Sequence, residues 1–150
     1  MKKSILASAE IKFLIQATED ENRFVKEVSK VLKIPFEKFE KSLLEGHFGN
    51  PINAIKVHLR GEIADKFAEG ILNLFLDDEK KNLLSEMSNH IDKHGSLYIR
   101  IDKQSIFTNK LIQSPIDPVR IRMKIRYKAP LPKMIESFRE SKFSYNHYTD

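Results

Sequence analysis

Hydrophobic residues change their spacing several times along the chain, and each change predicts a new element of secondary structure. The apolar run at residues 11–17 is typical of a largely buried strand. A capping box formed by Thr18 and Glu21 then predicts the start of a helix. We place the body of this helix at residues 22–32, because apolar residues recur there at helical spacing until Pro35.

The next segment contains two competing patterns. Residues 36–45 show both helical spacings and a short polar-apolar alternation, and we interpret them as a strand. Residues 46–51 are dense in turn formers and residues 52–59 alternate, which predicts a hairpin with a long turn. The remaining pattern predicts a helix at 63–76, a helix from 77 through 91 that ends at His94 and Gly95, a strand at 96–102, a helical or irregular connection at 103–110, a loop at 112–118, a strand at 119–127 and a helix at 133–143.

The resulting order, β-α-β-β-α-α-β-β-α, predicts a single α+β domain over residues 1–150 with a short polar C-terminal tail. A chain of 150 residues with 41% hydrophobic residues can bury a sizeable core. The chain has no Cys, which excludes disulfides, thiolate metal ligands and a Cys nucleophile. No apolar run reaches the roughly 18 residues of a membrane span, and residues 1–8 are too polar for a signal peptide. We therefore expect a cytoplasmic protein without a membrane partner.

Charge is distributed unevenly along the chain. Residues 1–92 carry 14 Lys and Arg against 16 Asp and Glu, whereas residues 93–150 carry 12 against 5. The net charge of +5 therefore comes from a C-terminal third at +7 and a remainder at −2. Such an asymmetry points to nucleic acid or another polyanion as a partner, and it directs attention to the C-terminal strands.

The strand predicted at residues 119–127 holds the strongest signal in the sequence. Side chains of a strand alternate between its two faces, so Arg120, Arg122, Lys124 and Arg126 share one face, and Lys128 extends the row. Cations this close repel each other unless acids on neighbouring strands neutralise them. Binding of a phosphate backbone would relieve the repulsion through counterion release.

Two explanations of this row remain open. In the first, the row is a solvated sheet face with cross-strand salt bridges to Asp102, Glu40 or Glu45. In the second, neighbouring strands add bases to the same face, and the outward candidates are Lys38, Lys41, Lys56, His58, Arg60, Arg100 and Lys103. Tyr98 is the main outward aromatic, so we expect phosphate and sugar contacts rather than stacking on single-stranded bases.

No enzyme motif stands out, and we predict neither a catalytic residue nor a metal or other cofactor. His90 and His94 have a helical spacing that could ligate a metal, but His94 directly precedes the predicted end of its helix at Gly95. The acids at 19–21 are explained by helix capping, and the turn at 46–51 lacks the spacing of a phosphate-binding loop. Among acids near the basic face, Asp102 is the one that a ribonuclease hypothesis would need.

Several phrases together resemble a known family. The phrases are FLIQATEDENRF at 13–24, LLEGHFGNPI at 43–52, HLRG at 58–61 and LYIRIDKQ at 97–104. They resemble archaeal RNA-binding proteins that are predicted exosome subunits. The resemblance implies an antiparallel sheet with helices packed on one face, as in the ribosomal protein that binds 5S rRNA. It also implies RNA contacts at His47, Asn50, Arg60, Lys103 and Gln104, a turn shaped by Gly46, Gly49 and Pro51, and an Asp102 that orients Lys103 or Arg100.

These observations support a non-enzymatic RNA-binding protein that grips the phosphate backbone of folded or double-stranded RNA, with the exosome as a candidate partner. The alternative is an adaptor that docks on an acidic protein, or on a second copy of itself, through the same face. The predicted RNA-binding residues are Arg120, Arg122, Lys124, Arg126, Arg100, Lys103, Gln104, His47, Asn50, Lys56, His58 and Arg60.

Overall fold

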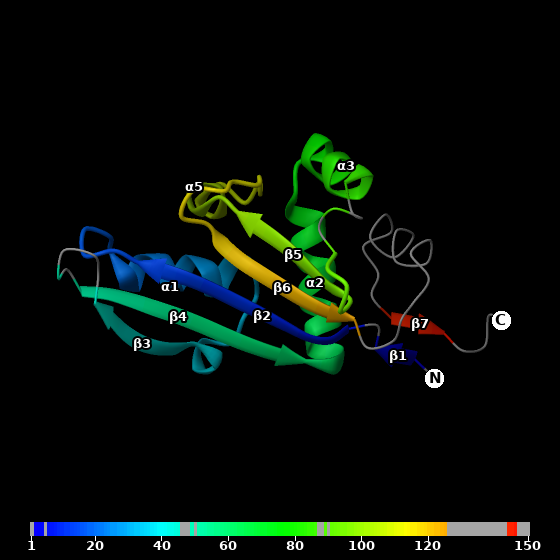
Figure 1. The fold of residues 1–150 in the computed structure, drawn as a ribbon, viewed down its shortest axis with the longest axis horizontal. Helices are drawn as coiled ribbons and strands as arrows, with labels where there is room; N and C mark the ends of the chain where they lie inside the picture. The colour runs from blue at the N-terminus through cyan, green and yellow to red at the C-terminus, as the bar shows by residue number, and fades with distance from the viewer. Residues whose placement is uncertain are drawn as a thin grey trace.

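Five antiparallel strands form one sheet in the order β3-β4-β2-β6-β5 (Figure 1). The computed structural model describes residues 2–4, 6–45, 49, 51–86, 89, 91–125 and 144–146. The strands of the sheet are β2 (Leu6–Ile15), β3 (Glu40–Glu45), β4 (Pro51–Arg60), β5 (Ser96–Ile101) and β6 (Val119–Ile125). A separate two-stranded sheet pairs β1 (Lys2–Ser4) with β7 (Ser144–Asn146).

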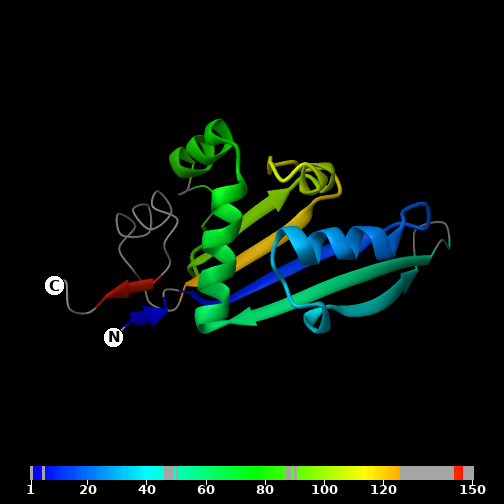
Figure 2. The same cartoon turned by 180° about the vertical axis from the view of Figure 1, so that it is seen from behind.

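The helices in the described part of the chain cover one face of the five-stranded sheet, and none of them covers the other, open face. The helices are α1 (Glu21–Val31), α2 (Gly61–Leu74), α3 (Asp77–Ser85), α5 (Lys103–Phe107) and the short 3-10 helix η1 (Phe36–Lys38). Seen from behind, α1 and α2 lie across the sheet, while α3 lies beyond the β5 edge (Figure 2). The predicted α+β fold, with an antiparallel sheet and helices packed on one face, is confirmed.

The hydrophobic core lies between the sheet and these helices. Register places Val57, Ile11, Ile121 and Ile99 in one row across four strands, and each is at most 1% exposed. Burying an aliphatic side chain of this size contributes about 1.5–3 kcal/mol. Phe13 packs edge to face against Phe24 of α1, with ring centroids 5.2 Å apart. The inward residues of the strands therefore hold the sheet and helices together.

β2 begins earlier and α1 is capped differently than the pattern predicted. The strand runs from Leu6, five residues before the expected start, because β2 is the central strand and pairs with β4 and β6 along this extension. The expected Thr18 cap is wrong, since Asp20 is the N-cap and its Oδ1 accepts a hydrogen bond from the Arg23 amide at 3.2 Å. The early start of β2 places Glu10 within the sheet.

The later boundaries also differ in part. Residues 36–45 begin with η1 before β3, and the helix expected through residue 91 ends at Ser85. Ile91 instead forms an antiparallel bridge with Leu97. The Asp92 carboxylate then accepts the backbone amides of His94 and Ser96, both at 2.9 Å, and so shapes the turn into β5. The helix expected at 133–143 lies outside the described residues.

Candidate nucleic-acid interface

The open face of the sheet carries cations on four adjacent strands. Residues that pair across strands point to the same side of a sheet, so the register assigns each outward residue to a row. We call this surface the cationic face, and its exposed basic residues are Lys12, Lys56, His58, Arg60, Arg100, Arg120, Arg122 and Lys124. Figure 1 views the sheet from this open side.

One row of the cationic face consists entirely of cations over four strands. Lys12 of β2 lies opposite both Lys56 of β4 and Arg120 of β6, and Arg120 lies opposite Arg100 of β5. Adjacent strands are about 4.8 Å apart, so the four residues follow one another at that spacing. Glu40 of β3 lies opposite Lys56 at the outer end of the row. Directly opposed like charges destabilise a sheet, which makes this row costly without an anionic ligand.

The neighbouring row contains the acid at the centre of the face. Glu10 lies between His58 and Arg122, and its carboxylate is 3.8 Å from Lys56 Nζ and 3.6 Å from Arg122 Nη1. Both contacts are long, and all three side chains are at least 32% exposed, so each pair contributes little, roughly 0.2–1 kcal/mol. Tyr98 ends this row beside Arg122.

Glu10 was missed by sequence reasoning because the strand was expected to begin at Ile11. Of the acids expected to neutralise the face, Glu40 lies at its rim, and the side chain of Glu45 is outside the described part of the chain. Asp102 has a structural role instead of neutralising the cationic face. Its carboxylate caps α5 by accepting a hydrogen bond from the Ser105 amide at 3.0 Å.

The third row contains Arg60, Ser8, Lys124 and Ser96. Over the three rows, the described charged residues are seven Lys and Arg side chains and two Glu side chains, with His58 counted as neutral. The local net charge is therefore about +5, as large as that of the whole chain, on one side of one sheet. The open face would attract a polyanion by long-range electrostatics.

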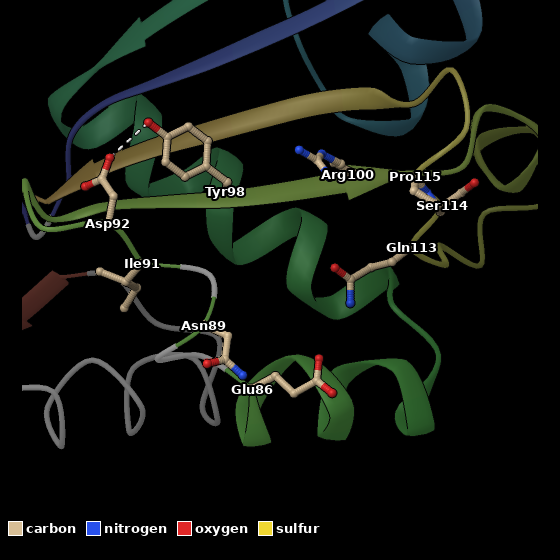
Figure 3. A pocket seen from close by; sticks show the side chains of 9 residues that line it. All are labelled: Glu86, Asn89, Ile91, Asp92, Tyr98, Arg100, Gln113, Ser114 and Pro115. Atoms are coloured by element: carbon tan, nitrogen blue, oxygen red, sulfur yellow. Dashed lines mark hydrogen bonds between the residues drawn. The ribbon is translucent and has the colours of Figure 1, made fainter.

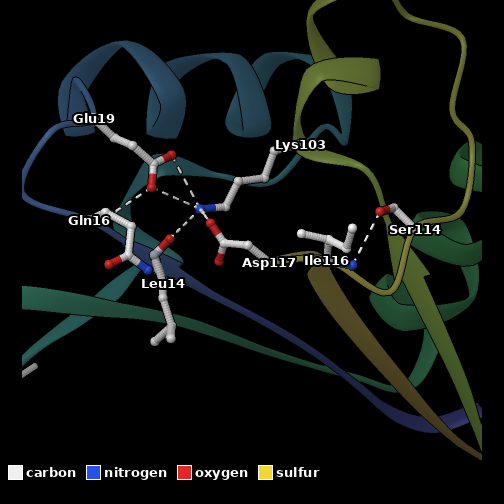
Figure 4. A network of polar contacts seen from close by, with 7 residues as sticks. All are labelled: Leu14, Gln16, Glu19, Lys103, Ser114, Ile116 and Asp117. Carbon is white, nitrogen blue, oxygen red and sulfur yellow. Dashed lines mark hydrogen bonds and ion pairs between the residues drawn. The ribbon is translucent and has the colours of Figure 1, made fainter. Parts of the chain in front are cut away.

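Lys103 does not lie on the cationic face, although it was expected to contact RNA. The residue is only 8% exposed. Its Nζ donates to the Leu14 carbonyl, to both Glu19 oxygens at 3.0 and 3.2 Å, and to Asp117 Oδ2 at 2.9 Å (Figure 4). This ammonium ties α5 to the end of β2 and to the segment before β6, which is a structural role. The expected orientation of Lys103 by Asp102 is replaced by Glu19 and Asp117.

The other predicted residues divide into three groups. The first group lies exposed on the cationic face and contains Lys56, His58, Arg60, Arg100, Arg120, Arg122 and Lys124. Gln104 is exposed on α5, beyond the strand rows, and Lys41 pairs with Glu21 of α1 at 3.1 Å on the helix side. His47, Asn50 and Arg126 lie outside the described residues, as do Gly46 and Lys128.

A pocket adjoins the cationic face at the β5 edge. Its volume is about 570 Å³, and it opens between β5, the residues that follow α3 and the segment 113–115 (Figure 3). Tyr98 and Arg100 enter its wall from β5, and Gln113 lies on the opposite side. The Tyr98 hydroxyl donates to Asp92 Oδ2 at 3.0 Å. The pKa of Asp92 is lowered, chiefly by the backbone hydrogen bond from Ser96, so Asp92 is a carboxylate at neutral pH.

The described part of the chain also bears on metal binding and on membrane insertion. Within those residues, no cluster of three or more His, Asp or Glu side chains could hold a metal ion. Among the described helices, none has the length and hydropathy to cross a membrane.

A cationic face on the sheet of an α+β domain is typical of proteins that bind a polyanion. Comparison with known proteins names the family within that class. Residues 8–127 match the RNA-binding family, and the chain belongs to it. The match spans β2 through β6 and therefore includes every row of the cationic face.

The chain is similar to proteins from three archaea, one of which is named as an RNA-binding protein. RNA-binding protein PAB1135 of Pyrococcus abyssi is 29% identical over 126 residues, which cover 77% of this chain and 79% of the relative. Uncharacterized protein MJ0213 of Methanocaldococcus jannaschii is 28% identical over 134 residues, covering 86% and 89%. The crystal structure of protein SSO0741 from Sulfolobus solfataricus has a TM-score of 0.70 at 25% identity, covering 87% of this chain and 98% of that one. The expected resemblance to an archaeal RNA-binding family is confirmed at this level.

Proposed function

We propose that this protein is a non-enzymatic RNA-binding protein that holds the phosphate backbone of folded or double-stranded RNA on its cationic face. The observation that carries the proposal is the row Lys56, Lys12, Arg120 and Arg100. Four consecutive cations on adjacent strands repel each other, and the long contact between Lys56 and Glu10 offsets little of that repulsion. Phosphates would supply the missing counter-charge and release condensed cations from the RNA.

The shape of the face favours structured RNA. The row spans three inter-strand gaps of about 4.8 Å, or roughly 14 Å, which is enough to contact several phosphates at once. Tyr98 is the aromatic that the described rows present to solvent, at 43% exposure, so the face offers little surface for stacking successive bases. Backbone and shape recognition is the usual way in which proteins bind duplex RNA.

Salt dependence of RNA affinity tests the proposal. Removing Lys12 and Arg120 together, as Lys12→Gln with Arg120→Gln, should weaken binding and reduce the slope of log affinity against log salt by about 1.4–1.8. The charge-matched control is Lys26→Gln with Lys66→Gln, which removes two exposed cations from α1 and α2 on the helix side. The control should retain the wild-type slope. Equal slopes in both double variants would refute backbone binding by this row.

The adaptor hypothesis makes a different prediction for the same variants. If the face docks on an acidic protein or on a second copy of the chain, the purified protein binds no hairpin RNA at low salt. A nuclease-resistant complex would then depend on Lys12 and Arg120. The continuous array of cations over four strands favours RNA, because an RNA backbone presents a regular series of phosphates to such an array.

Association with the exosome is a narrower part of the proposal and rests on the sequence resemblance alone. Pull-down from an archaeal extract, with and without ribonuclease, tests it. Loss of exosome subunits after ribonuclease treatment would mean that RNA bridges this protein and the exosome. Absence of exosome subunits from both samples would refute the proposed association. Cleavage of structured RNA that is lost on Asp102→Asn would overturn the non-enzymatic assignment, as would any metal-dependent cleavage.

A further inference from the structure

We infer that the pocket beside β5 accepts one unpaired base of the RNA whose phosphates lie on the cationic face. The inference rests on the proposed function and adds a specificity to it. A face of Lys and Arg side chains contacts phosphates without reading the base sequence. A pocket that adjoins such a face can distinguish an RNA with an extruded base from a fully paired one.

The position of the pocket carries the first step of the argument. Arg100 ends the row of four cations and also lines the pocket, while Tyr98 ends the neighbouring row and lines it too. An RNA strand that follows either row toward the β5 edge therefore arrives at the pocket opening. Arg100 can hold the phosphate of the extruded nucleotide there, and the base then lies beside the Tyr98 ring.

The chemistry of the pocket favours a base over a further phosphate. Asp92 is ionised at neutral pH and lies in the wall next to the Tyr98 hydroxyl, so a second negative group would be repelled. The amide side chains of Gln113 and Asn89 offer both donors and acceptors, which suit the polar edge of a neutral base. The volume of about 570 Å³ lies within the roughly 300–1,000 Å³ typical of small-ligand sites.

Hydrogen bonds between several elements hold part of the pocket wall. The hydrogen bond to Asp92 orients the Tyr98 ring. The backbone amide of Gln113 donates to Glu79 Oε2 of α3 at 3.1 Å, and Gln113 forms an antiparallel bridge with Ile101 at the end of β5. The Ser114 amide donates to the Arg100 carbonyl at 3.1 Å. A site held by contacts from several elements loses little entropy when it binds a base.

Three hairpin RNAs of equal stem length test the inference. The first is fully paired, the second carries one bulged nucleotide, and the third carries an abasic residue at the same bulge. Wild-type protein should bind the bulged hairpin at least about fivefold more tightly than the other two, the lower end of what stacking on an aromatic ring contributes. The abasic hairpin separates recognition of the base from recognition of the bent backbone.

Variants locate the preference. Gln113→Ala and Tyr98→Ala should abolish the preference for the bulged hairpin while leaving the salt slope unchanged, and Tyr98→Phe should keep most of it because the ring remains. Lys12→Gln is the matched control on the face, expected to weaken all three complexes equally. Circular dichroism confirms that each variant is folded.

Equal affinity of the wild type for all three hairpins would overturn the inference and leave the proposed function standing, provided that binding is salt-dependent. A preference that survives both Gln113→Ala and Tyr98→Ala would place the base elsewhere and also overturn it. Failure to bind any hairpin at low salt would overturn both the inference and the proposed function.

Discussion

Lys12 has like charges on both sides in its row, so replacing it should stabilise the free protein while it weakens RNA binding. The residue is exposed at the centre of the sheet, opposite Lys56 and Arg120. In Lys12→Gln both repulsions disappear, and the side chain keeps nearly the same length and polarity. The change therefore isolates the charge.

The expected magnitude follows from the spacing of the strands. Charged ends that start about 4.8 Å apart and splay into solvent lie roughly 7 Å apart, where two unit charges in water repel by about 0.6 kcal/mol. Two such neighbours give about 1.2 kcal/mol, and attraction to Glu10 in the adjacent row offsets part of this. We expect a net stabilisation of roughly 0.5–1 kcal/mol, which corresponds to an increase in Tm of about 1–4 °C.

Thermal unfolding at two salt concentrations is the appropriate measurement. The stabilisation should be present at 0.01 M salt, where the Debye length is about 30 Å, and should largely vanish at 1 M, where it is about 3 Å. Lys66→Gln on α2 is the control, since Lys66 follows Glu62 by one helical turn and its loss should be neutral or slightly destabilising. A lower Tm for Lys12→Gln at low salt would refute the claim that the row is electrostatically frustrated.

Three further changes test other parts of the structure. Glu10→Gln should strengthen RNA binding by about two- to fivefold and lower stability by up to about 1 kcal/mol, because it removes the acid that contacts Lys56 and Arg122; filter binding with unchanged or weaker affinity would contradict this. Lys103→Met should cost about 1–3 kcal/mol in urea unfolding without changing the RNA affinity of the folded protein, and weakened RNA binding would restore Lys103 as a contact. Asp92→Asn should flatten the dependence of Tm on acid pH. Because folding lowers the pKa of Asp92, the stability that this carboxylate contributes is complete above its ordinary pKa of 3.8 and is lost as the pH falls through the lower pKa of the folded protein. Equal profiles of Tm against pH for the variant and the wild type would contradict this role of Asp92.

Local alternation was sufficient to predict much of the cationic face. Side chains of a strand alternate whatever its partners are, so the period-2 pattern around residue 121 identified Arg120, Arg122 and Lys124 as neighbours on one face. The same reasoning placed Lys56 and Arg100 outward. What it could not provide was the register, which decides that Lys12, and no acid, lies between Lys56 and Arg120.

Long-range contacts account for the predictions that were wrong. Lys103 is followed by a polar residue and looked like an exposed cation, but its partner Glu19 is 84 residues away in sequence. Glu19 was assigned to local helix capping, a role that belongs to Asp20. Lys103 was assigned to RNA and Glu19 to a helix cap. Their pairing depends on how α5 packs near the start of α1, which local sequence patterns do not reveal.

The two faces of the sheet have different roles, and this explains how the row of repelling cations on the open face persists. Ile11 lies between Glu10 and Lys12 in β2 but points inward, and it is completely buried. Its burial contributes about 1.5–3 kcal/mol, which exceeds the net repulsion expected at Lys12. Each strand of the row has an inward neighbour of this kind, so the core outweighs the charges on the open side. Charges on the open face can therefore be arranged for a ligand without loss of the fold, and the stability gained in Lys12→Gln measures how far that arrangement departs from what the fold alone would favour.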